Sequence, residues 1–89
     1  MIEEIINELR QKISEIVGKQ ETLWLDDPIE FTYNSCRAAI VGVKYNSVII
    51  EEDYGYNNWQ TELDLEDLDE DLLCKVEYYV DLQTNESEC

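Results

Sequence analysis

Histidine is absent from the 89-residue sequence, and lysine and arginine together number only six. Without an imidazole, a serine or cysteine nucleophile has no histidine base, and a zinc site loses one of its ordinary ligands. The net charge of −16 repels nucleic acids and anionic lipid surfaces, because their phosphates are bound by lysine and arginine. The composition therefore excludes histidine-dependent catalysis and direct nucleic-acid binding, and it favours basic protein surfaces as partners.

Proline and glycine are also scarce, with one and three residues, while 44% of the chain is hydrophobic. This balance indicates a folded chain, because it offers enough apolar surface to offset the loss of conformational entropy. The glycines are too far apart for a phosphate-binding loop. No Cys-x-x-Cys pair occurs, which fits free thiols in a reducing compartment, at Cys36, Cys74 and Cys89.

Long apolar runs are missing as well. No stretch approaches the roughly 20 apolar residues of a membrane span, and Glu3 and Glu4 interrupt the first isoleucines, unlike in a secretion leader. We therefore expect a cytoplasmic protein with no membrane association. The length is typical of one domain, which we place at residues 1–83, followed by a flexible tail at 84–89.

The first 17 residues have the apolar spacing of a helix, in steps of four and three. Gly18 is well placed to end this helix in the left-handed conformation. The apolar stripe is suited either to packing on the protein's own sheet or to a short coiled-coil seam between two copies. The residues that would form the seam are Ile2, Ile6, Leu9, Ile13 and Ile16.

Alternating apolar and polar residues predict a meander of strands after a turn at residues 26–28. The expected strands are 29–33, 36–45, 48–52 and 59–65, separated by turns at 34–35, 46–47 and 53–58. Gly42 lies within the second strand, where a glycine indicates a bulge or a close neighbour.

A second helix is predicted over residues 70–82. Asp69 is the expected N-cap, and Leu68 and Leu73 have the spacing of a hydrophobic staple. We therefore expect an α+β fold in the order α-β-β-β-β-α. It consists of an N-terminal helix, an antiparallel meander of three to four strands and a C-terminal helix, with both helices on one sheet face.

Acidic residues are concentrated in the second half of the chain. Of the 22 acids, 14 lie in residues 51–89, against a single base, Lys75. Residues 51–62 have the length of an EF-hand loop, but Glu51 stands where aspartate is usual and Tyr56 where glycine is required. We expect no metal, no cofactor and no enzymatic activity.

Tyrosine and tryptophan occur beside carboxylates in this half, a combination typical of protein interfaces. Carboxylates four residues apart on a helix are also spaced like DNA phosphates, at about 6 Å. We expect a non-enzymatic interaction protein that binds a basic protein surface, with DNA mimicry that inhibits a nuclease or DNA-binding protein as its narrowest form. The expected partner-binding residues are Asp53, Tyr54, Tyr56, Trp59, Glu62, Asp64, Glu70, Asp71, Glu77 and Asp81.

Two other interpretations remain open. The acidic surface can serve solubility alone, or the chain can be a structural or assembly module that homodimerises through the N-terminal helix. The leucine-acid motif LEDLDEDLL at residues 65–73, after a short meander and an Ile/Leu helix, resembles small uncharacterised acidic proteins of gut bacteria and their phages. Some small acidic phage proteins inhibit host restriction or CRISPR nucleases by occupying nucleic-acid grooves, so the resemblance implies a mimic and carries no catalytic residues.

Overall fold

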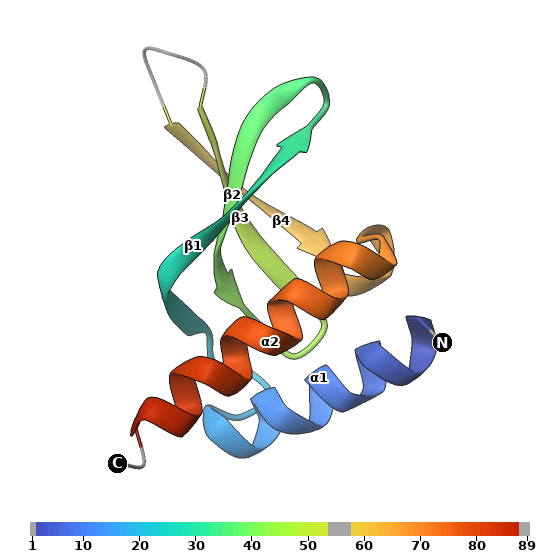
Figure 1. Ribbon diagram of the computed structural model, residues 1–89, viewed down its shortest axis with the longest axis vertical. Helices are drawn as coiled ribbons and strands as arrows, with labels where there is room; N and C mark the ends of the chain where they lie inside the picture. The colour runs from blue at the N-terminus through green and yellow to red at the C-terminus, as the bar shows by residue number, and fades with distance from the viewer. Residues whose placement is uncertain (1, 54–57, 88–89) are drawn as a thin grey trace.

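The computed structural model describes residues 2–53 and 58–87, with side chains described for 2–52 and 59–84. A four-stranded antiparallel sheet lies between two helices in the sequence, which confirms the predicted α-β-β-β-β-α order. Figure 1 shows α2 lying across the twisted sheet, with α1 beside α2. The elements are α1 (Ile2–Ile16), β1 (Leu23–Tyr33), β2 (Cys36–Val43), β3 (Ser47–Asp53), β4 (Asn58–Asp64), the short 3-10 helix η1 (Leu65–Asp67) and α2 (Glu70–Ser87).

The strands follow one another in sequence order, so β1 and β4 are the two edges of the sheet. The first hairpin pairs Tyr33 with Cys36 across a two-residue turn. Asn34 and Ser35 both have positive φ, 51° and 63°, as the turns that match the strand twist require. Asn34 and Ser35, which the sequence pattern predicted to be a turn between two strands, therefore form a tight hairpin turn.

The first strand begins earlier than predicted, at Leu23 rather than Ile29. The expected turn at residues 26–28 is an irregularity within this strand, between the pairs Trp24–Gly42 and Ile29–Ile40. Leu25 is 8% exposed and joins the core, so burial of this side chain holds the segment against the sheet. The sequence pattern placed the start of the strand only after the turn at residues 26–28.

Gly42 occupies a crowded position, as its place in the sequence predicted. The register of β2 against β3 shifts between Ile40 and Gly42. A Cβ atom on Gly42 would lie 2.9 Å from Cγ2 of Thr22 and 3.1 Å from Cε3 of Trp24. The predictions of a bulge and of a close neighbour are both confirmed.

Both predicted helix boundaries that depend on a cap are confirmed. Gly18 has φ +95°, and its N–H donates to the carbonyl of Ile13 at 3.1 Å. Oδ1 of Asp69 accepts a 2.8 Å hydrogen bond from the N–H of Leu72, which satisfies a free donor of the first turn.

The second helix is longer than predicted, because it continues to Ser87. The Thr84 hydroxyl donates to the carbonyl of Val80 at 2.9 Å, and Gln83 is bonded to β1. Residues 84–87 are therefore helical rather than a loose tail, while Glu88 and Cys89 lie outside the described residues.

The core lies between the helices and one face of the sheet. Apolar side chains from both helices, η1 and the first three strands are less than a tenth exposed there. Among the described residues, no helix covers the other face of the sheet. In the described part of the chain, no helix is long and apolar enough to cross a membrane. The buried cluster consists of Ile6, Leu9, Ile13, Leu25, Ile29, Ile40, Val43, Val48, Ile50, Leu65, Leu68, Leu73, Val76 and Val80.

Candidate functional site

Carboxylates are densest in residues 64–71, the segment that joins β4 to α2, which we call the acidic corner. The corner carries six acids, and all of them are exposed while Leu65 and Leu68 point into the core. The alternation follows from the motif, since the buried leucines hold the backbone and leave the acids outside. The six are Asp64, Glu66, Asp67, Asp69, Glu70 and Asp71.

Few positive charges offset the acidic corner. Nη2 of Arg10 lies 4.0 Å from the carboxylate of Glu66, and this contact is long for an ion pair. Within residues 2–52 and 59–84, Asp64, Asp67, Glu70 and Asp71 have no ion-pair partner. The corner is therefore a local excess of negative charge that is open to solvent.

Both helices begin at the acidic corner, because α1 and α2 run side by side in the same direction (Figure 1). Each helix N-terminus carries a partial positive charge that stabilises nearby carboxylates. Glu3 and Glu4 lie in the first turn of α1, and Glu70 and Asp71 in the first turn of α2. The fold thus collects acids where the backbone field favours negative charge.

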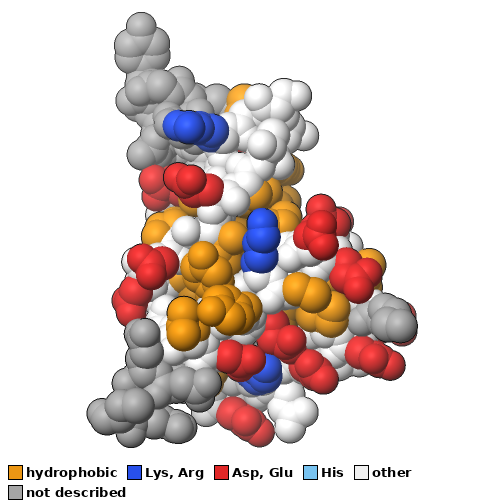
Figure 2. Space-filling view, viewed as in Figure 1, with side chains coloured by type: hydrophobic (Ala, Val, Ile, Leu, Met, Phe, Trp, Pro, Cys, Tyr) orange, Lys and Arg blue, Asp and Glu red, His pale blue; other side chains and the backbone are white. Residues whose placement is uncertain are grey.

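A hollow with a mixed polar and apolar lining lies beside the acidic corner, between the end of β1 and the start of α2. Its volume is about 520 Å³. Leu68 at its base is buried, whereas the other apolar walls are half-buried. Figure 2 views the face of the molecule that carries the two helices, where exposed hydrophobic side chains lie among acidic ones. The hollow is lined by Phe31, Tyr33, Leu63, Leu68 and Leu72, together with Thr32, Asn34 and the acids Asp67 and Asp69.

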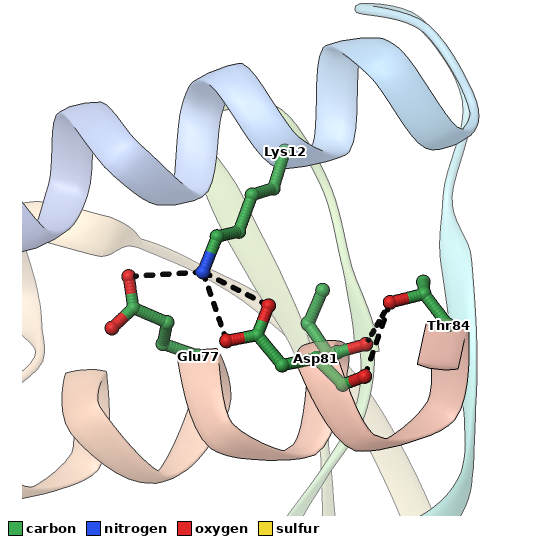
Figure 3. Close-up of polar contacts among 5 residues, drawn as sticks. Lys12, Glu77, Asp81 and Thr84 are labelled. Carbon is green, nitrogen blue, oxygen red and sulfur yellow. Dashed lines mark hydrogen bonds and ion pairs between the residues drawn. The ribbon is translucent and has the colours of Figure 1, made fainter. Parts of the chain in front are cut away.

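Two of the predicted partner-binding acids, Glu77 and Asp81, contact α1, although the side chain of Asp81 is still 46% exposed. Nζ of Lys12 lies 2.9 Å from both carboxylate oxygens of Asp81 and 3.5 Å from Oε2 of Glu77 (Figure 3). The side chain of Glu77 is only 23% exposed. Glu77 is therefore not a freely exposed carboxylate, because α2 packs against α1 on the side that carries it.

The Lys12 cluster combines attraction with an unfavourable burial of charge. Burial opposes the charge of Lys12, but the hydrogen bond to Asp81 and the charges of Glu77 and Asp81 outweigh it and raise the lysine pKa. Burial also raises the pKa of Glu77, with a hydrogen bond to Glu8 adding to the effect and Lys12 opposing it. Asp81 is therefore the principal partner of Lys12. The position of Glu77 beside them disfavours the ionised form of its carboxyl group.

The predicted residues of β4 lie on two different faces. Trp59 is opposite Glu52 on the helix side, where it is 58% exposed, and Glu62 is opposite Ile49 on the helix-free face. A hydrogen bond from the Ser47 hydroxyl, 2.7 Å long, and Lys44 at 3.2 Å lower the pKa of Glu62.

Of the expected partner-binding set, only Asp64, Glu70 and Asp71 meet at one surface, the acidic corner. The predictions for Tyr54 and Tyr56, and for the side chain of Asp53, lie outside the described residues. The predicted partner-binding set omitted Glu66, Asp67 and Asp69 of the acidic corner, and it omitted every residue that lines the hollow. The leucine-acid motif at residues 65–73 could have indicated these three acids. Phe31 and Tyr33 line the hollow together with Leu72 of α2. No nearby sequence pattern predicts this arrangement, because it depends on how the sheet curves.

The stripe expected for homodimerisation is occupied by the protein's own core. Ile6, Leu9 and Ile13 are at most 3% exposed, and only the end residues Ile2 and Ile16 are exposed, at 40% and 39%. The interpretation in which this helix packs on its own domain is therefore confirmed. A dimer seam through the same stripe would require the three central residues to leave the core.

Other groupings of polar residues are less concentrated. A smaller hollow of about 390 Å³ on the helix-free face carries Glu30 and Glu51 together with Arg37. Among the described residues, no cluster of three acids or cysteines has the arrangement of a metal site.

Comparison with known proteins found no matching family model, no similar curated protein and no similar solved structure.

Proposed function

We propose that this protein is a non-enzymatic interaction protein whose acidic corner binds a basic protein surface. The observation that carries the proposal is the set of six exposed carboxylates in residues 64–71, of which Arg10 contacts one. Such an excess attracts a cationic partner over long range and orients it before contact. Glu70 and Asp71 lie in the first turn of α2, where the partial positive charge of the helix N-terminus stabilises negative charge.

DNA mimicry is the narrower form of the proposal. In it, the basic surface is the nucleic-acid groove of a nuclease or DNA-binding protein, and the carboxylates take the place of phosphates. Competition separates the two forms, since a mimic is displaced by duplex DNA, whereas a partner bound elsewhere is not. The proposal itself requires only that the partner be basic.

A pair of matched variants tests the proposal. The corner variant carries Asp64→Asn, Asp67→Asn, Glu70→Gln and Asp71→Asn. The control variant carries Glu15→Gln, Glu21→Gln, Asp26→Asn and Asp27→Asn, which are also exposed acids. Both variants lose four negative charges from the wild-type −16, so they differ in where the charge is lost rather than in its amount. Glu77 is left unchanged because it contacts Lys12.

Each protein is used as bait for lysate at low salt and at high salt, and the captured proteins are identified by mass spectrometry. We expect the wild type and the control variant to retain the same basic proteins at low salt and to release them at high salt. The corner variant should lose them at both. Equal capture by the two variants, or no capture by the wild type at low salt, would contradict the proposal.

A further inference from the structure

The hollow beside the acidic corner has an apolar wall and a polar, acidic rim. Phe31, Leu63 and Leu72 are half-buried around its volume of about 520 Å³, and Leu68 closes the base. Apolar side chains left partly exposed around a concave surface lose contacts with water when a partner fills it. An apolar side chain that fills the hollow therefore adds hydrophobic binding energy to the charge attraction of the acidic corner.

The charges on the rim restrict what can enter. Asp67 and Asp69 line the hollow, and Glu70 and Asp71 follow in the first turn of α2. A neutral or acidic surface that covers the carboxylates of the rim leaves their charges buried without a partner, which is unfavourable. Lysine or arginine beside the entering side chain would pair with these carboxylates and offset that cost. A second copy of this chain carries the same net charge of −16 and is repelled.

We propose that the hollow accepts one aromatic or large aliphatic side chain of a basic protein segment, while lysines or arginines that flank this anchor residue contact the acidic corner. This inference rests on the proposed function and adds the sequence character of its partner. The corner supplies charge attraction, and the hollow supplies selection among basic segments. An apolar anchor surrounded by charged contacts is the arrangement that concentrates binding energy in protein interfaces.

Two labelled peptides test the inference by fluorescence polarisation. One is a lysine peptide with a single central tryptophan, and the other has alanine in place of the tryptophan. We expect the wild-type protein to bind the tryptophan peptide about tenfold more tightly or better, as burial of one large apolar side chain predicts.

The hollow is altered by Leu72→Gln on α2 and, on a different element, by Leu63→Gln on β4. The matched control is Leu82→Gln, which replaces an exposed leucine outside the hollow. Both hollow variants should lose the preference for tryptophan while binding of the alanine peptide stays unchanged, and the control should keep the preference. Circular dichroism verifies that each variant is folded, and either hollow variant alone suffices if the other unfolds.

The outcomes distinguish this inference from the proposed function. Equal binding of the two peptides by the wild type overturns the anchor, and so does a preference that survives in a folded hollow variant or disappears in Leu82→Gln. The proposed function still stands if the four-residue corner variant weakens binding of both peptides more than its matched control does. If the two charge variants bind alike, the proposed function fails. Concentration-dependent dimerisation that is lost in Leu72→Gln would instead assign the hollow to a second copy and overturn the inference.

Discussion

Lys12 and Asp81 lie 69 positions apart in the sequence, yet Nζ of the lysine is 2.9 Å from each carboxylate oxygen of the aspartate. This contact joins α1 to α2 (Figure 3). The same ammonium group is 3.5 Å from Oε2 of Glu77, so one lysine of α1 contacts two acids of α2.

Removal of this lysine should destabilise the fold. We expect Lys12→Met to lower the free energy of unfolding by about 1 kcal/mol, because Glu77 and Asp81 then repel each other without a counter-charge. The lysine is one third exposed, which limits the effect. Urea denaturation measures it. Lys75→Met is the control, since Lys75 is exposed and has no ion pair among the described residues, and an equal loss in both variants would contradict the prediction.

Ionisation of Glu77 should lower the free energy of unfolding as the pH rises, which is uncommon for a carboxylate. Its pKa is raised in the folded protein, so the folded state binds the proton more tightly than the unfolded state does. The stabilisation is present below the ordinary value of 4.5 and is lost as the pH rises through the folded pKa. Glu77→Gln should therefore raise the free energy of unfolding at neutral pH, by less than about 1 kcal/mol, and should bring no gain below pH 4.5.

Thermal unfolding across this pH range, with Glu70→Gln as an exposed control on the same helix, measures the effect of Glu77. A gain in the control as large as that in the Glu77 variant, or a loss of stability on Glu77→Gln at neutral pH, would show that burial is not what sets the pKa of Glu77.

Gln83 should hold the irregular part of β1 in place. Its side-chain amide donates to the carbonyl of Trp24 at 2.9 Å and accepts from the N–H of Asp26 at 3.0 Å, much as a neighbouring strand would. Gln83→Ala should cost about 1 kcal/mol and speed hydrogen exchange at the Asp26 amide. NMR measures the exchange. Gln20→Ala, an exposed glutamine elsewhere, should leave it unchanged, and unaltered exchange in the Gln83 variant would count against the role.

Gly42 should resist even the smallest side chain. We expect Gly42→Ala to cost about 1–3 kcal/mol, because its Cβ would lie within 3.1 Å of both Thr22 and Trp24. In a Trp24→Ala background the cost should fall, since one of the two obstructing groups is gone. A double-mutant cycle by chemical denaturation measures this coupling. Additive costs would mean that the indole moves aside freely.

The acidic corner could be predicted from the sequence only in part. The motif at residues 65–73 indicated buried leucines and exposed acids, and the structure has both. The same reasoning treated Glu77 and Asp81 as equivalent to Glu70 and Asp71, because all four avoid the apolar stripe of one helix. Which of them meets α1 depends on how the two helices pack, and no spacing within α2 contains that information.

Local chemistry in the sequence determined the helix ends at Gly18 and Asp69, the alternation along the strands and the order of the elements, because each depends on residues a few positions apart. Tertiary structure alone decided that α1 and α2 run in the same direction, which brings Lys12 to Asp81 and both helix N-termini to one end. It also brought Phe31 of β1 and Leu72 of α2 to the walls of one hollow. The physical reason is that these contacts depend on the packing of distant elements and on the twist of the sheet, which side-chain spacing does not encode.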